Sequence, residues 1–153
     1  MRALELKIPP PVVALLVGVA MWAISHAAAR IEISAPVRIG AALVIAIAGV
    51  CIAVAGALAF RHAHTTTSPV KPEAASSLVT SGIYRFTRNP MYLGLCLVLL
   101  AWAFFLSSVL AFLGPIVFVF YIGRFQIAPE ERALSRIFGA AFADYRATVR
   151  RWI

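Results

Sequence analysis

The chain has 153 residues, of which 62% are hydrophobic and 13% charged, and its mean hydropathy is +0.91. Soluble domains carry about a quarter charged residues, so this composition excludes a soluble fold and predicts a membrane-embedded one. The net charge of +8 would suit nucleic acid or anionic lipid, but the basic residues flank apolar runs instead of forming one stripe, which favours membrane lipids and no nucleic-acid partner.

The first two apolar runs predict membrane-spanning helices over residues 11–29 and 37–60, because about 20 apolar residues cross a bilayer. The second run carries Gly49, Ala53 and Ala57 at four-residue spacing. Such a face allows another helix to approach closely, although the same residues would also fit a lipid-facing, alanine-rich surface.

Residues 61–88 interrupt the apolar pattern, and three threonines with Pro69 and Pro72 predict an irregular loop. His62 and His64 lie two residues apart without a third partner, which is poor geometry for a metal site. We therefore expect solvated histidines and no metal.

The third apolar stretch, Leu93 to Gly123, contains no charged residue and is too long for one span. As a straight helix it would reach roughly 46 Å. The Ser107–Ser108 and Gly114–Pro115 pairs predict instead a tight helical hairpin, with arms over residues 89–106 and 108–125.

The tail over residues 129–152 predicts an amphipathic helix. Pro129 suits the first helical position, and Glu130 and Glu131 favour the positive end of the helix dipole. Apolar residues then recur at steps of three and four: Leu134, Ile137, Phe138, Phe142, Tyr145, Val149 and Trp152. Such a helix is typical of an interface with anionic lipid.

The four predicted spans form a single all-α, integral membrane helical bundle covering residues 1–153. They place twelve of the 14 basic residues on one side, so both termini and the 61–88 loop are predicted to be cytoplasmic, in a bacterial inner membrane. A signal peptide is the alternative for the first run, although its apolar part is longer than usual.

Two separated segments carry a family resemblance. LVTSGIYRFTRNPMYLG (Leu78 to Gly94) and PEERALSRIFGAAFADY (Pro129 to Tyr145) flank the apolar hairpin. Together they resemble the isoprenylcysteine carboxyl methyltransferase family, whose wider group includes membrane phospholipid N-methyltransferases. The resemblance covers residues 65–150 and implies a membrane-embedded helical enzyme that uses S-adenosylmethionine to methylate a lipid-like or apolar acceptor.

The resemblance also implies the site residues. Arg124 would face the substrate and Glu131 would close the site, which makes these two the catalytic candidates. The implied cofactor-binding residues lie in the loop, at the start of the third span and at the start of the tail: Leu78, Val79, Tyr84, Asn89, Pro90, Met91, Tyr92, Glu130 and Glu131.

These residue types suit methyl transfer, which requires alignment and desolvation at a sulfonium carbon. Tyr84 and Tyr92 offer ring faces to a cation. A carboxylate at Glu130 or Glu131 accepts hydrogen bonds from ribose hydroxyls or an amino group, and Arg124 pairs with a substrate carboxylate or phosphate.

One position departs from the family pattern, because Asn89 stands where the prenylcysteine enzymes have histidine. Asparagine does not titrate near neutral pH, so the acceptor is expected to be a lipid amine, a thiol or a small apolar acid instead of a prenylated protein.

Two non-enzymatic functions are alternatives. A four-span transporter usually has an acidic residue within a span, whereas all six acidic residues lie outside the predicted spans. A scaffold that has lost the cofactor remains open. The acidic residues are Glu5, Glu32, Glu73, Glu130, Glu131 and Asp144.

Overall fold

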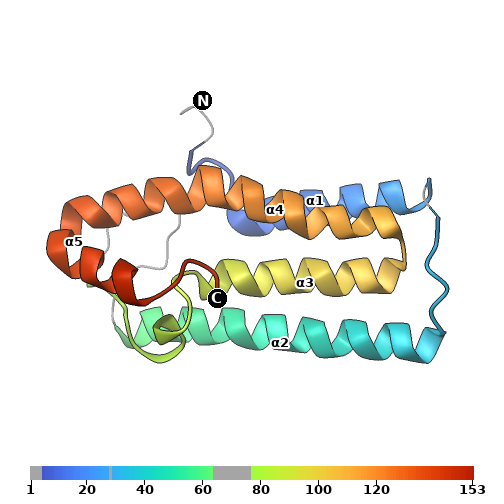
Figure 1. Cartoon of the computed structure of the whole chain (residues 1–153), viewed down its shortest axis with the longest axis horizontal. Coiled ribbons are helices and arrows are strands. Elements are labelled where there is room, and N and C mark those ends of the chain that lie inside the picture. Colours follow the sequence, from blue (N-terminus) through green and yellow to red (C-terminus); the bar gives the residue numbers. More distant parts are fainter. Residues whose placement is uncertain (1–4, 28, 64–76) are drawn as a thin grey trace.

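A computed structural model describes residues 5–27, 29–63 and 77–153, and every regular element in these ranges is helical. Figure 1 shows α1 to α4 running lengthwise side by side, with α5 extending beyond one end. The elements in chain order are α1 (Pro10–Ser25), α2 (Ala35–His62), the 3₁₀ turn η3 (Gly82–Arg85), α3 (Pro90–Leu106), the 3₁₀ turn η4 (Val109–Phe112), α4 (Leu113–Ile122), the π-helical turn η5 (Gly123–Ile127) and α5 (Ala128–Thr148). The all-helical prediction is confirmed for these ranges.

Local sequence explains where several helices begin and end. Proline occupies the first turn of α1, α2 and α3, where its missing N–H costs no hydrogen bond. Pro129 does not start a separate helix as predicted, because α5 continues directly from the π-helical turn η5. At the far end of α3, Ser107 adopts a left-handed conformation (φ 52°) and the chain reverses. α4 then returns alongside α3.

Two helical segments are long and apolar enough to cross a membrane: Ala35–His62, and the continuous helical stretch Val109–Thr148. α1 and α3 are apolar but have 16 and 17 residues, about 24–26 Å against a hydrocarbon core of about 30 Å. The count of four membrane crossings therefore stays a prediction. The outer face of α2 is widely apolar, with Val44 69% exposed and Ile47 61% exposed. Such a surface suits lipid better than water.

Small residues bring α2 and α3 into close contact. A Cβ added to Gly49 would lie 2.7 Å from the carbonyl oxygen of Gly94, and one added to Gly56 would lie 2.9 Å from Pro90 Cγ. A Cβ added to Gly94 would lie 2.7 Å from Ala53 Cβ, so the predicted face packs on α3 at Gly49 and Ala53. Gly56, seven residues after Gly49, lies on the same side, because seven residues come within about 20° of two full helical turns.

The tail differs from the predicted continuous helix over 129–152. Gly139 breaks α5 with φ 49° and ψ −120°, a conformation that favours glycine. α5 ends at Thr148, and Val149 is extended. Figure 1 shows the second half of α5 turning back, so that the C-terminus lies near the start of α3.

Candidate active site

The first turns of α3 and α5 meet through a direct hydrogen bond. The hydroxyl of Tyr92 donates to Glu130 Oε1 at 2.5 Å, and Tyr92 is only 6% exposed. The pKa of Glu130 is raised to about 8, chiefly because burial disfavours the charged carboxylate. The Tyr92 hydrogen bond opposes this shift, and the negative charge of Glu131 adds to it.

Tyr84 lies close to the same pair. Its ring meets the ring of Phe60 edge-on, with 5.3 Å between centroids, and its carbonyl oxygen accepts a 2.7 Å hydrogen bond from the hydroxyl of Tyr145. Burial raises the pKa of Tyr84, and the charges of Tyr145 and Glu130 raise it further. Tyr84 is therefore a neutral phenol. The structure thus brings Tyr84, Tyr92 and Glu130 together.

Glu131 has a different environment from its neighbour. Its carboxylate is held by Arg151, whose Nη2 lies 2.6 Å from Oε2 and whose Nε lies 3.2 Å from Oε1. Arg88 Nη2 lies 3.3 Å from the same Oε1. Two guanidinium groups therefore hold the Glu131 carboxylate. Glu131 thus connects α5 to the loop before α3 and to the C-terminal residues.

The last residues of the chain pair with the loop before α3, and we call residues 149–153 the C-terminal clasp. The amide nitrogen of the Asn89 side chain donates to the carbonyl oxygen of Arg151 at 2.9 Å, and Thr87 Oγ1 donates to the same oxygen at 3.4 Å. The backbone N–H of Arg88 donates to the carbonyl oxygen of Arg150 at 3.1 Å. Asn89 thus holds the clasp.

Four other predicted cofactor-binding residues are described by their packing and burial. Pro90 and Met91 are the side chains that a Cβ on Gly56 would meet first, so they lie against α2. Val79 is buried and Leu78 is half-buried. The structure shows neither in a hydrogen bond or aromatic contact with the pair formed by Tyr92 and Glu130.

Arg124, predicted to face the substrate, is half exposed and lies 3.4 Å from Glu5 Oε1. Glu5 also pairs with Arg132 at 2.5 Å. The described N-terminal segment therefore reaches the start of α5, and its carboxylate anchors two arginines on the outside of the site.

Two buried polar groups near the pair lack partners. Gln126, fully buried in η5 and one turn before Glu130, donates through Nε2 to the carbonyl oxygen of Ile8 at 2.6 Å, while its Oε1 has no partner. Arg88 Nε and Nη1 are likewise buried without a hydrogen-bond acceptor. Burial lowers the pKa of Arg88; Glu131 opposes this, and Arg146 and Arg151 add to it. The site thus offers buried donors and a buried acceptor.

Sequence reasoning missed several of these residues. Arg88 and Tyr145 stand inside the two family-like segments, so their motif positions were an available signal. Gln126 carries a weaker signal, as a polar residue directly after an apolar run. Glu5 and Arg151 carry no sequence signal. Glu5 contacts a partner 119 residues away and Arg151 one 20 residues away, and such contacts leave no periodic pattern in the sequence.

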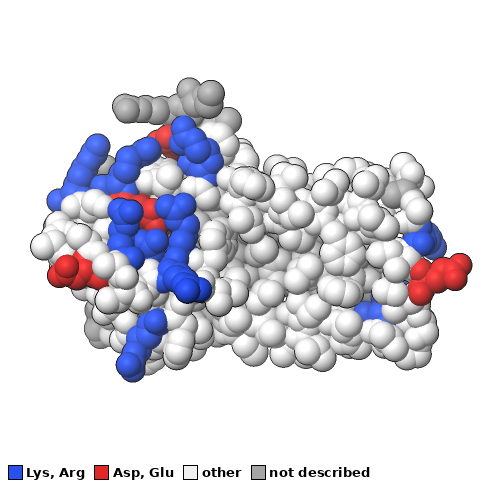
Figure 2. All heavy atoms as spheres, in the orientation of Figure 1, with Lys and Arg blue, Asp and Glu red and all other residues white. Residues whose placement is uncertain are grey.

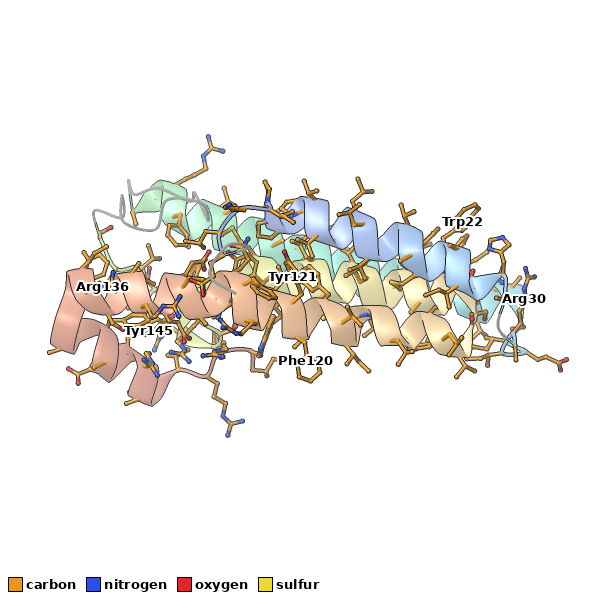
Figure 3. The ribbon with its side chains drawn as sticks, turned by 90° about the horizontal axis from the view of Figure 1, so that it is seen from above. Trp22, Arg30, Phe120, Tyr121, Arg136 and Tyr145 are labelled. Atoms are coloured by element: carbon orange, nitrogen blue, oxygen red, sulfur yellow. The ribbon has the colours of Figure 1, made fainter. Side chains whose placement is uncertain are left out.

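The charge distribution marks this end of the bundle. Figure 2 shows arginine and lysine side chains gathered around acidic ones over α5 and its surroundings, followed by a long uncharged band. In Figure 3, Tyr145 lies at this end, whereas Trp22 and Arg30 lie at the other. Within the described ranges no group of three His, Cys, Asp or Glu residues is suited to a metal, and His64 lies outside them.

Comparisons with known proteins place the chain in a family. Residues 37–141 match the model of a family described as phospholipid methyltransferase. An uncharacterised protein of Haemophilus influenzae is 49% identical over 63 residues, which is 41% of this chain and 100% of that protein. No solved structure matches significantly. The matched region runs from α2 into α5 and includes Tyr84, Tyr92 and Glu130, so this membrane protein belongs to the phospholipid methyltransferase family.

Proposed function

We propose that the chain transfers a methyl group from S-adenosylmethionine to a lipid-like acceptor, of which a phospholipid amine is the strongest candidate. The observation that carries the proposal is the 2.5 Å hydrogen bond from Tyr92 to Glu130. It joins the two family-like segments through residues 38 apart in sequence, at the charged end of an apolar bundle.

The unpaired groups of the site suit this cofactor. When bound, S-adenosylmethionine supplies an electrophilic methyl group on a sulfonium centre. The free N–H groups of Arg88 would pair with a carboxylate, and Gln126 Oε1 and Glu130 would accept hydrogen bonds from amino or hydroxyl groups. The rings of Tyr84 and Tyr92 would face the cationic centre.

The protein contributes water exclusion and a proton acceptor. Tyr92 belongs to the hydrophobic core cluster, so one wall of the site is backed by packed apolar side chains. Exclusion of water strengthens every electrostatic contact inside the site. An amine acceptor loses one proton for each methyl group gained. The ionised form of Glu130, whose pKa is raised to about 8, is suited to take that proton.

A phospholipid amine is favoured over a thiol or an apolar acid for two reasons. The family description names phospholipids, and the site lies among arginines that suit a phosphate, including the half-exposed Arg124. Proton balance also argues against an apolar acid, because an ionised carboxylate has no proton to lose, whereas an amine or a thiol needs a proton acceptor such as Glu130.

Ligand-dependent thermal stability tests cofactor binding. S-adenosylhomocysteine at 100 times a micromolar Kd should stabilise the purified protein by about 2.7 kcal/mol, which raises Tm by several degrees, whereas ATP should not. Tyr92→Phe and Glu130→Gln should reduce this shift, and His62→Ala, an exposed residue, should leave it unchanged. No shift at millimolar ligand in the wild type would overturn the proposal and favour a scaffold.

Label transfer tests the acceptor. With methyl-labelled S-adenosylmethionine, vesicles containing phosphatidylethanolamine should take up label in the lipid fraction, and vesicles of phosphatidylcholine alone should not. Binding of the cofactor without label in any phosphatidylethanolamine product would contradict the amine assignment while leaving methyl transfer to another acceptor.

A further inference from the structure

A second feature lies along the uncharged band, in the half of the bundle that points away from the candidate active site. α1 and α2 both pack on α3, and between them the structure contains an open groove of about 710 Å³. One wall runs from Pro11 to Trp22 of α1 and the other from Ile39 to Ala46 of α2, while α3 contributes Val98 to Phe105.

The groove is almost entirely apolar. One of its two indole donors, Trp102 Nε1, is already bonded to the carbonyl oxygen of Gly18 at 3.0 Å. The eight-residue stretches of α2 and α3 that line it span about 12 Å, which is most of one leaflet of a hydrocarbon core about 30 Å thick. A hydrocarbon chain lying along the bundle matches this shape and chemistry.

A cation stands at the outer end of the groove. Arg38 lies in the first turn of α2, next to the lining residue Ile39, and its Cζ is 5.6 Å from the ring centroid of Phe105, another lining residue. Arg38 Nε is buried and has no hydrogen-bond acceptor. Within the described ranges every ion pair lies near the other end of the bundle, on Glu5 or Glu131, so none neutralises Arg38.

We propose that this groove binds one acyl chain of an anionic bilayer lipid, with the lipid phosphate paired to Arg38. The charge of the guanidinium selects the headgroup, and the apolar walls hold the chain. The site lies in the leaflet away from the candidate active site, so it is a binding site separate from methyl transfer. The proposal does not depend on the proposed function.

Two of the three tryptophans, Trp22 and Trp102, line the groove, and this provides a direct reporter. Purified full-length protein in mixed micelles would be titrated with lipids brominated on the acyl chain, which quench tryptophan fluorescence on contact. Brominated phosphatidylglycerol should quench at about fivefold lower mole fraction than brominated phosphatidylcholine, the preference expected for one basic residue near a headgroup.

Variants assign the preference to Arg38. Arg38→Gln should bring the two lipids to the same mole fraction, and Arg38→Lys should keep part of the difference. Arg30→Gln is the matched control, because it removes the same charge at the same end from an exposed residue outside the groove. Ala46→Phe, which fills the groove, should reduce quenching by both lipids.

Several results would overturn the proposal. Equal quenching by both lipids in the wild type would show that Arg38 selects nothing. An Arg30→Gln effect as large as that of Arg38→Gln would show a diffuse surface charge. Unquenched fluorescence together with a dimeric mass in the micelle would show that a second copy fills the groove.

Discussion

Glu130 and Glu131 illustrate how neighbouring identical residues acquire different roles. Successive residues on a helix point about 100° apart, so the two carboxylates leave α5 in different directions. Glu131 meets Arg88 and Arg151, whereas Glu130 meets the hydroxyl of Tyr92. We therefore propose the cofactor contact for Glu130 and a positioning role for Glu131.

The raised pKa of Glu130 predicts a specific pH dependence of stability. Its folded pKa of about 8 exceeds the ordinary value of 4.5, so the folded protein binds the proton more tightly than the unfolded chain. The stabilising contribution is complete below about pH 4.5 and is lost as the pH rises through about 8. Glu130→Gln should flatten that part of the curve of Tm against pH.

Asp144→Asn is the control for this measurement, because Asp144 is an exposed acidic residue on the same helix. It should keep the wild-type slope. A Glu130→Gln protein whose Tm falls between pH 5 and 8 as steeply as that of the wild type would show that Glu130 is not the titrating group.

At the level of elements, the C-terminal clasp joins the start of α3 to the start of α5. Its backbone accepts hydrogen bonds from Thr87, Arg88 and Asn89, and its Arg151 side chain holds Glu131. Trp152 packs against the hydrophobic core cluster. These contacts span both family-like segments, so we expect the clasp to help position Tyr92 relative to Glu130.

Removal of the Arg151 side chain should therefore weaken the site more than the fold. Its guanidinium is partly exposed, so Arg151→Ala should cost about 1 kcal/mol of stability. The affinity for S-adenosylhomocysteine should fall about tenfold, measured by calorimetry in detergent. Arg150→Ala, which keeps the backbone carbonyl that Arg88 uses, should leave the affinity unchanged. Equal affinities of Arg151→Ala and wild type for S-adenosylhomocysteine would show that the clasp does not contribute to cofactor binding.

At the scale of the whole molecule, charge is concentrated at the ends. The uncharged band separates the arginine-rich end from an opposite end formed by the α1–α2 connection and the start of α2. That segment contains Arg30, Glu32 and Arg38. Cytoplasmic loops carry the excess of basic residues, so the arginine-rich end is expected to face the cytoplasm. The candidate site would then receive its polar cofactor from the cytosol and its acceptor from the bilayer.

Reporter fusions test this arrangement. A reporter at the C-terminus and one before Glu5 should both report the cytoplasm, and one inserted near Glu32 should report the opposite side. A periplasmic C-terminus together with a cytoplasmic N-terminus would refute four crossings, since an even number returns the chain to the side from which it starts.

Much of the architecture followed from patterns within single segments. Apolar runs and their flanking prolines and arginines placed the helices, because these signals depend on the solvent and on local backbone geometry. The Ser107–Ser108 pair predicts a turn from the same kind of local signal. The break at Gly139 was missed, because an isolated glycine in an amphipathic pattern is usually tolerated.

For the candidate site, too, the sequence predicted some features and only the fold revealed others. Sequence motifs named Tyr84, Tyr92 and the two glutamates, because a resemblance preserves residue types at fixed spacing. Which glutamate meets Tyr92, that Asn89 holds the clasp, and that Arg124 pairs with Glu5 became known only from the fold.

By itself the sequence determined that this is an apolar, helical membrane protein with one basic side, since composition and periodicity follow from the solvent that surrounds each segment. Tertiary structure alone decided the partners of each charged group and the groove between α1 and α2. Those features depend on distances between residues far apart in the chain, and such distances are set by packing, which no local pattern encodes.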